Sequence, residues 1–394
     1  MINFHQLPRE HLRNFVDAGN DLFYRVSGFV LMPPVFQNGY YYFVLQAQAV
    51  QAGGLKFTCC GKLLIRMEFE EFLNYGERLS LAGQIKRHKS VGQEVNLIMA
   101  VKDARQIIRE GGFGGAKITR EILKLRSHLE SIIRQQLPRL PAGILCAMVL
   151  GQQQNVPWAV RNAMVESGTV HILVVSGFNV GIVAFIANLL LKFLRLPRRL
   201  RVILVGVNLI IYCLLTGASN PVVRATIMGL IYLGAYFLRR DPDIFNSLFC
   251  AALLILTVRP GEIFDLGFEL SFASVLAIIY FYPRLKRWLR PEQYQNRMVK
   301  FFIEGGLVSF AAWLGTCGIL AFNFRMVTPV TVLANLVVVP LATLITLCGF
   351  AMLLVGLACP GLAEIFSLPA AALITILLNL NTVLARLPLA CIYF

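Results

Sequence analysis

Long apolar segments fill the second half of the chain, and their lengths predict a bundle of membrane-spanning helices. Most are close to the ~20 residues with which an α-helix crosses a hydrocarbon core of roughly 30 Å. About eight spans are predicted, at residues 172–191, 202–218, 222–238, 244–258, 267–283, 303–322, 330–357 and 362–386. The fourth is short, and the seventh contains Pro340, which predicts a kink or a break.

The first 110 residues alternate apolar and polar positions, with turn residues between the runs, which is typical of β-strands. Candidate strands are residues 22–31, 40–50, 56–67, 77–85 and 94–101. Five short strands favour a small OB-like β-barrel, although a fragment of a β-sandwich fits the same pattern. The aromatic run Tyr40–Phe43 could stack nucleic-acid bases, but ordinary strand packing is the more common role of such a run.

Between these regions lies a glycine-rich break at 110–115 and then an amphipathic stretch, Lys117–Leu137. Its apolar residues recur every three or four positions, which predicts a helix on the membrane surface with its basic side on lipid headgroups. The apolar run 142–151 is too short to span and predicts a re-entrant or core-buried segment. We therefore expect three parts: an OB-like domain at 1–110, an interfacial helix at 111–140 and a transmembrane domain at 141–394.

Composition supports the membrane assignment: 57% of the residues are hydrophobic and only 15% are charged, and the mean hydropathy is +0.66. Soluble domains carry about 25% charged residues. Nine scattered cysteines show no CxxC spacing, so we interpret them as small hydrophobic residues, and we predict neither metal nor cofactor. The net charge of +16 has a simple source in cytoplasmic loops, which collect Lys and Arg.

Loop charges also predict the orientation. Loops 192–201, 239–243 and 284–302 hold thirteen Lys and Arg residues, whereas the alternate loops 219–221, 259–266 and 323–329 hold two. The first set is therefore expected in the cytoplasm, which puts the β domain outside. Because no signal peptide or span precedes that domain, we expect that the start of the protein is missing; the alternative is a cytoplasmic domain with 142–151 crossing the membrane.

Polar residues interrupt the apolar runs in a few places, and these are the candidate site. His171, Ser176 and Asn179 would fall on one arc of about 140° if one helix contained all three. Gly177 and Gly181 beside that arc have a spacing that lets a second helix approach closely. We expect this helix to face a polar centre, because polar side chains are costly in hydrocarbon.

A second group is TGASNPVVR, residues 216–224. Ser219 or Asn220 can cap a helix that starts at Pro221, and Arg224 follows within a turn. A helix N-terminus with an arginine suits an anion such as phosphate. An arginine that reaches outward to lipid headgroups is an equally good interpretation.

Two further spans carry polar residues. Glu269 stands at the start of one span, with Ser271 beside it. Its carboxylate either complements the helix dipole or lines a polar path. Asn335 lies inside another span, where it either bonds to a neighbouring helix or faces a pore.

The segments GTVHILVVSGFNVG, LTGASNPVVRATIMG, NSLFCAALLILTVRPGEIFDLGFELSF and TPVTVLANLVVVP together resemble the competence domain of ComEC-type DNA-uptake channels. The predicted β domain fits the OB-like module of that family, so the resemblance covers most of residues 20–394. By position it extends to His171, Ser176, Gly177, Gly217, Ser219, Arg224, Ser271, Asn335 and Pro340.

The resemblance implies a multi-pass inner-membrane channel, not an enzyme, that passes single-stranded DNA into the cytoplasm. Expected partners are DNA, membrane lipids, a separate nuclease, a DNA receptor and a cytoplasmic helicase. Two residues depart from the family pattern: Asn179 replaces the usual His, and Glu269 replaces the more frequent Gln. The metallo-β-lactamase-like nuclease domain of many members is not found among these residues, and no His-x-His-x-Asp-His motif is present.

Two other classes of function compete with a DNA channel. A small-solute transporter fits the spans but leaves the β domain unexplained. An intramembrane serine hydrolase would use Ser176 or Ser219 with His171, but GxSxG is absent, and the five-residue offset from His171 to Ser176 suits a nucleophile–base pair poorly.

Overall fold

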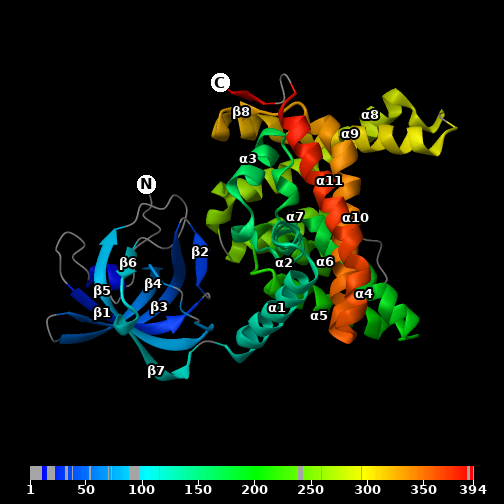
Figure 1. The fold of residues 1–394 in the computed structure, drawn as a ribbon. Coiled ribbons are helices and arrows are strands. Elements are labelled where there is room, and N and C mark those ends of the chain that lie inside the picture. Colours follow the sequence, from blue (N-terminus) through cyan, green and yellow to red (C-terminus); the bar gives the residue numbers. More distant parts are fainter. Residues whose placement is uncertain are drawn as a thin grey trace. The chain divides into compact units, whose positions relative to one another are not determined.

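The computed structural model describes residues 11–15, 23–31, 34–37, 39–52, 55–69, 71, 73–87, 97–114, 116–237, 243–258, 260–293, 295–387 and 391–393. Its contacts divide the chain into two compact units, residues 1–124 and 125–394. The first is built from strands and the second from helices (Figure 1).

The first unit is a seven-stranded sheet. Its strands are β1 (Phe23–Val30), β2 (Val35–Gln37), β3 (Tyr40–Ala52), β4 (Leu55–Met67), β5 (Glu77–Arg87), β6 (Leu97–Val101) and β7 (Ile107–Phe113). Each of the five predicted strands has a counterpart here, although residues 22 and 94–96 lie outside the described part of the chain. β2 and β7 are additional, and β7 includes most of the stretch that the glycines predicted to be a break.

Five of these strands form a closed cycle of hydrogen-bonded neighbours. β1 pairs with β3, β3 with β4, β4 with β6, β6 with β5, and β5 again with β1. The β4–β6 pair is parallel and the other four are antiparallel. An N-terminal β domain is thereby confirmed, while its finer assignment as an OB-like fold remains a prediction.

Inward-facing side chains of these strands make one apolar core. On β1 the alternation is regular, with Tyr24 and Val26 buried and Phe23 and Arg25 exposed. Half of the aromatic run belongs to this packing: Phe43 is buried in the core and Tyr41 packs against it. Tyr40 and Tyr42 are not part of the core; their ring centroids lie 6.4 Å apart, and the guanidinium of Arg66 lies over the Tyr40 ring.

All nine cysteines are free thiols, and three of them, Cys59, Cys146 and Cys213, are buried. Cys59 is buried on β4, and burial, together with the neighbouring Cys60, raises the pKa of its thiol to about 11. At neutral pH this side chain is therefore an uncharged thiol in the core and a poor nucleophile.

The second unit contains ten further helices among the described residues, after α1 (Lys117–Gln136), which runs from the first unit into the second. They are α2 (Arg139–Leu150), α3 (Trp158–Glu166), α4 (Gly177–Phe193), α5 (Arg198–Leu215), α6 (Asn220–Phe237), α7 (Ile244–Val258), α8 (Leu266–Leu289), α9 (Arg297–Phe324), α10 (Thr331–Ala358) and α11 (Ser367–Ala385). Helices α4 to α11 correspond to the eight predicted spans.

Five segments of the described chain are long and apolar enough to cross a membrane. They are Val170–Phe193, Leu266–Leu289, Arg297–Phe324, Thr331–Ala358 and Pro360–Ala385. A multi-pass helical membrane protein is thereby confirmed. α7 is apolar but has only 15 residues, or about 22 Å of helix, so it is shorter than the bilayer core. α5 and α6 remain predicted spans.

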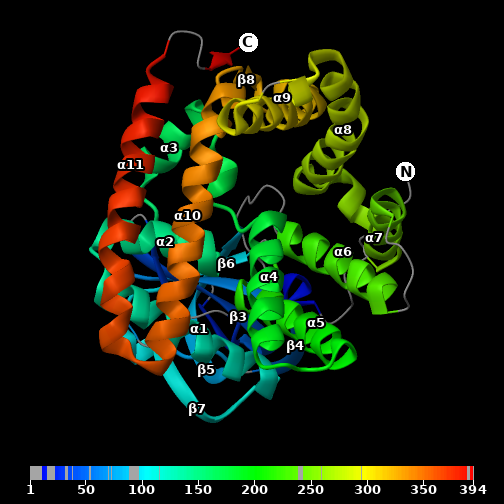
Figure 2. The same ribbon diagram turned by 90° about the vertical axis from the view of Figure 1, so that its right-hand side faces the viewer.

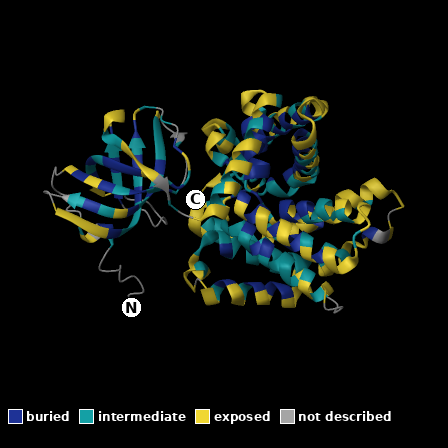
Figure 3. Cartoon of the chain, turned by 90° about the horizontal axis from the view of Figure 1, so that it is seen from below, coloured by how far each residue is buried: buried dark blue, intermediate teal, exposed yellow. Residues whose placement is uncertain are grey.

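Helix contacts in this unit form a ring (Figure 2). α6 packs on α5, α4 and α8, α8 packs along α9, α9 meets α10, and α10 packs on α2 and α11. The ring closes where Tyr212 of α5 lies against Phe350 of α10 and where Asn179 of α4 bonds to Met148 of α2. Figure 3 shows buried residues where helices meet and exposed residues on the outer sides of the helices. Many exposed residues are large and apolar, such as Phe185, Leu253 and Leu333, as expected of surfaces that face lipid.

α2 lies inside this packing. Every residue from Ala142 to Leu150 is buried, and Gly349 of α10 lies against Leu145 and Val149. Of the two predicted alternatives for the segment 142–151, re-entrant or buried in the core, the structure shows the second.

The second half of α1 packs on its own protein: Leu129, Ile132 and Ile133 are buried, and Ile132 lies against Gly356 of α10. Placement of this helix on a membrane surface remains a prediction.

Candidate functional site

The start of α6 is joined to the start of α8 by polar contacts. Asn220 Nδ2 donates at 3.0 Å to Oε2 of Glu262, which lies in the short turn η5 (Pro260–Phe264). One turn later, Arg224 Nη2 donates to the carbonyl of Gly267 at 2.7 Å, and Nη1 lies 4.0 Å from Asp265 Oδ1. These contacts bring together two of the sequence-predicted groups, TGASNPVVR and GFELSF.

Arg224 is buried, with 3% of its surface exposed, so it does not extend to lipid headgroups. Its Nε and Nη1 make no hydrogen bond to the described residues. Asp265 already accepts from the backbone N–H of Phe268 as the N-cap of α8, at 2.9 Å. A buried guanidinium with two open N–H positions is suited to bind water or an anion oxygen, although the carboxylates beside it offset part of its charge.

Other predicted residues also lie near this junction. The carbonyl of Ser219 accepts the first helical bonds of α6, from Val222 and Val223, and Pro221 is the second residue of that helix. Glu269 is half-buried in the first turn of α8, where the helix dipole favours its carboxylate. Ser271 is half-buried on the next turn, and Gly217 precedes α6 with φ +85°.

Asn179 of α4 has a separate partner. It is buried, and its Nδ2 donates to the carbonyl of Met148 at 2.7 Å. Tyr212 of α5 donates to the next carbonyl, Val149, at 3.0 Å. The last carbonyls of a helix lack hydrogen-bond donors within that helix. Here the side chains of Asn179 and Tyr212 donate to two of them inside the core. Asn179 therefore anchors the C-terminus of α2.

We expect Asn179→Ala to lower the free energy of unfolding by about 1–3 kcal/mol, because a buried carbonyl loses its donor. Asn179→His should lose less than half as much because its ring N–H can donate. Thermal unfolding of the detergent-solubilised protein measures both. The control Asn188→Ala removes an exposed Asn from the same helix and should change little. Equal melting of Asn179→Ala and wild type would contradict the anchoring role.

His171 and Ser176 do not share a helix with Asn179, so the predicted arc is wrong. His171 lies in the 3-10 turn η4 (Val170–Ile172), and its Nδ1 is 3.2 Å from the carbonyl of Gly168. Ser176 is extended, with φ −104° and ψ 171°, at the N-cap position of α4, which begins at Gly177. Serine favours this position over the interior of a helix. The helix therefore starts after Ser176, several residues later than the apolar run does.

The glycine pair of α4 has one close contact rather than two. A Cβ on Gly177 would lie 3.3 Å from Cβ of Ala225, so this glycine lets α4 approach α6. Gly181 is exposed and has no described atom within 4 Å of its Cβ position. Gly181 lies on the same face one turn later, but no described helix comes close to it there, so its predicted helix-packing role is not seen.

Asn335 of α10 bonds across to α9. Its Nδ2 donates to Ser309 Oγ at 3.0 Å, while its Oδ1 has no partner among the described residues. Pro340, one and a half turns later, does not break the helix, which runs without interruption from Thr331 to Ala358. Of the two predicted alternatives, the break is therefore wrong, and a kink at Pro340 remains a prediction.

A buried network that the sequence did not reveal joins the turn before α4 to α11. Ser167 and Thr169 are fully buried, and both donate to Asn381 Oδ1, at 2.9 and 2.5 Å. Asn381 in turn donates to Leu377 within its own helix. Between the two hydroxyl residues, Gly168 has φ +71°, and a Cβ there would overlap the hydroxyl of Thr331.

Apart from His171 in η4, the predicted site residues thus fall on three sets of elements: α6 with η5 and α8, α4 with α2 and α5, and α10 with α9. Their hydrogen bonds hold helices together at each place. Among the described residues, no group of three His, Cys, Asp or Glu side chains could hold a metal ion. The first set is where buried polar N–H groups remain open.

Comparison with known proteins gives the family. The sequence model of the Competence protein family matches residues 148–394. The chain is 30% identical to ComE operon protein 3 of Bacillus subtilis (strain 168) over 230 residues, 58% of this chain and 28% of that protein. It is 31% identical to an uncharacterized protein of Aquifex aeolicus (strain VF5) over 216 residues, 53% of this chain and 46% of that one.

The uncharacterized protein YcaI of Escherichia coli (strain K12) is 24% identical over 300 residues, 69% of this chain and 38% of its own length. The chain thus spans less than half the length of the curated relatives it matches. No solved structure matches. The family match covers more than half of the chain and all of the helices in which the polar residues lie. The chain therefore belongs to the Competence protein family.

Proposed function

We propose that this chain forms part of a path by which single-stranded DNA crosses the cytoplasmic membrane during natural transformation. The observation that carries the proposal is the match to the Competence protein family over the helical unit. The ring of helix contacts supports it, since polar side chains from several helices of that ring are buried between them. A role in competence and a multi-pass membrane location are given by family and fold; passage of DNA is the proposed step.

Arg224 is the residue we place on the DNA path. A strand that passes through a membrane protein needs contacts to its phosphates. Nε and Nη1 of Arg224 are buried and make no hydrogen bond to the described residues, so they can donate to a phosphate oxygen once α6 and α8 move apart at their junction. Because Asp265 and Glu262 lie beside it, this contact would be weak and transient, as transport requires.

We expect Arg224→Ala to reduce uptake of labelled DNA at least tenfold in a naturally transformable host, with a normal amount of protein in the membrane. Arg224→Lys should restore only part of the uptake, because the three N–H groups of lysine share one nitrogen and cannot span Gly267 and a phosphate as the wider fork of a guanidinium can. The control Arg199→Ala removes an exposed arginine from the first turn of α5 and should leave uptake within twofold. Normal uptake by Arg224→Ala would remove this residue from the path.

The broader proposal is tested by a deletion strain. Loss of uptake on deletion, restored by this chain, supports it. Uptake that is unaffected by the deletion overturns it. Small-solute flux through the purified protein in liposomes, without DNA binding, would favour the transporter alternative, and labelling of Ser176 or Ser219 by a fluorophosphonate would favour a hydrolase. We further propose a separate nuclease, a DNA receptor and a cytoplasmic helicase as partners of this chain.

A further inference from the structure

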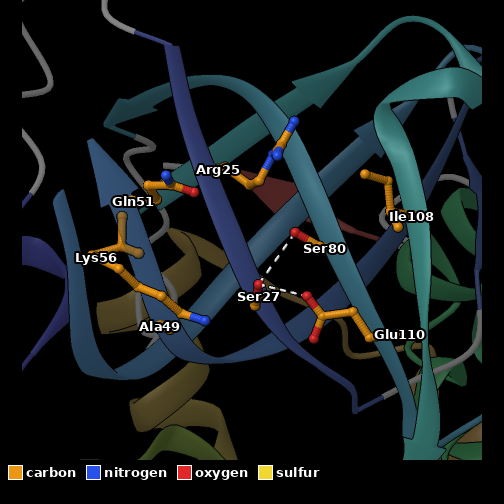
Figure 4. Close-up of a pocket in the computed structure, with 9 residues that line it drawn as sticks. Arg25, Ser27, Ala49, Gln51, Lys56, Ser80, Ile108 and Glu110 are labelled. Carbon is orange, nitrogen blue, oxygen red and sulfur yellow. Dashed lines mark hydrogen bonds between the residues drawn. The ribbon is translucent and has the colours of Figure 1, made fainter. Parts of the chain in front are cut away.

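A pocket of about 210 Å³ opens on the outward face of the first unit (Figure 4). Its lining comes from five strands that neighbour one another in the order β7, β5, β1, β3, β4. No residue of the predicted site contributes to it.

Strand register places two cations and an amide in one row. Arg25 on β1 pairs with Gln51 on β3, and Gln51 pairs with Lys56 on β4. Neighbouring strands are ~4.8 Å apart, so the three side chains stand side by side along the sheet. They face outward because the residues on either side of Arg25 belong to the core.

The floor of the pocket is made of short side chains. Ser27 lies two residues after Arg25 and pairs with Ala49 on one side and Ser80 on the other. Ser27 Oγ is 3.2 Å from Ser80 Oγ and donates to Glu110 Oε1 at 3.0 Å. Small residues between longer ones create the hollow, and two hydroxyls line its base (Figure 4).

The pocket has cationic side chains, Arg25 and Lys56, on one side and a carboxylate, Glu110, on the other. Neither Arg25 nor Lys56 forms an ion pair with a carboxylate of the described residues. By contrast, Arg109 of the same unit is paired with Glu71 at 2.6 Å and Glu77 at 3.1 Å. Glu110 enters the pocket from β7, at the opposite side of this group of strands from Lys56. The pocket therefore has open cations on one side and an acceptor on the other.

We propose that this pocket binds one nucleotide unit, with the phosphate at Arg25 and Lys56 and a base-edge N–H donor at Glu110. Phosphate oxygens accept from both cations, and a carboxylate accepts from an exocyclic amine such as the N4 amine of cytosine. The exposed Ile108 offers an apolar surface to the ring. The inference rests on the proposed function, because that function brings single-stranded DNA to the protein; a free nucleotide offers the same chemistry.

The test uses the full chain in detergent and fluorescein-labelled dC12 and dT12. The double variant Arg25→Gln/Lys56→Gln should bind dC12 at least tenfold more weakly, with a log–log salt slope smaller by about 0.7 for each phosphate that is no longer bound. The control Lys86→Gln/Arg87→Gln removes the same two charge types from the exposed end of β5 and should change affinity less than twofold. Equal affinities of the pocket variant and the control would overturn the proposal.

Glu110→Gln supplies a second readout that charge loss alone cannot produce. The wild type should prefer dC12 over dT12 at least threefold, and Glu110→Gln should remove this preference while keeping the affinity for dT12. Displacement of dC12 by free dCMP identifies a mononucleotide ligand, and dC12 that resists dCMP identifies the strand. No preference in the wild type would overturn the role of Glu110. If deletion of this chain abolishes DNA uptake but the pocket variants take up DNA normally, the pocket proposal alone is overturned. If the pocket binds DNA but deletion of the chain leaves uptake normal, the proposed function alone is overturned.

Discussion

Gly168→Ala is expected to lower the free energy of unfolding by roughly 3–5 kcal/mol. The residue has φ +71°, where an L side chain costs about 1–2 kcal/mol. In addition, a Cβ would overlap the hydroxyl of Thr331 and lie 2.8 Å from that of Thr328, and overpacking typically costs about 1–3 kcal/mol. Thermal unfolding in detergent measures the change.

The matched control for this substitution is Gly181→Ala. Gly181 lies within a helix, has no described atom within 4 Å of its Cβ position and should gain up to about 1 kcal/mol from the better helix propensity of alanine. Gly168→Ala/Thr331→Ala removes the overlap with the Thr331 hydroxyl but keeps the Cβ of residue 331 at 2.9 Å, so only part of the loss should return. A melting temperature of Gly168→Ala equal to that of the wild type would show that the turn before α4 can move aside.

Asn381→Ala is expected to lower the free energy of unfolding by about 3–5 kcal/mol. The substitution leaves the buried hydroxyls of Ser167 and Thr169 without their acceptor, at about 1–3 kcal/mol for each unsatisfied group. The two hydroxyls lie 2.9 Å apart and can partly compensate by bonding to each other. The expected loss of stability is therefore smaller than the largest value for two unsatisfied groups.

Asn379→Ala is the control for Asn381, because it removes the same side chain from an exposed position of the same helix. It should change the melting temperature little. Since Asn381 joins α11 to the turn before α4, limited proteolysis should cut the turn at 167–176 faster in Asn381→Ala than in Asn379→Ala. Equal melting and equal cleavage of the two variants would contradict the network's role.

The sequence predicts elements well where one periodicity dominates. Alternation on β1 and β4 and the apolar runs of α4 to α11 are set by burial along one element, so each is visible locally. β7 was not predicted, because IIREGGF lacks alternation and pairs with β5 through its backbone. The start of α4 was misplaced, since Ser176 and the 3-10 turn at His171 leave the apolar pattern unchanged.

Polar residues of the candidate site were found in the sequence, but their partners were not. An intramembrane Arg or Asn is conspicuous in an apolar run, so Arg224, Asn179 and Asn335 could be singled out. Asn381 lies in an equally apolar helix, yet its bonds are to hydroxyls more than 200 residues away, and serine and threonine before α4 are unremarkable in a loop. Pairings of this kind depend on how helices pack, which no local pattern encodes.

The short strands Met326–Val327 (β8) and Ile392–Tyr393 (β9) pair with each other, one before α10 and the other after α11. Two successive passages of the bilayer return the chain to the leaflet from which it started, and this antiparallel pair closes that return with hydrogen bonds. A topology reporter placed at either strand would therefore give the same answer for both. Reversing one of the two helices in the membrane would require breaking the pair.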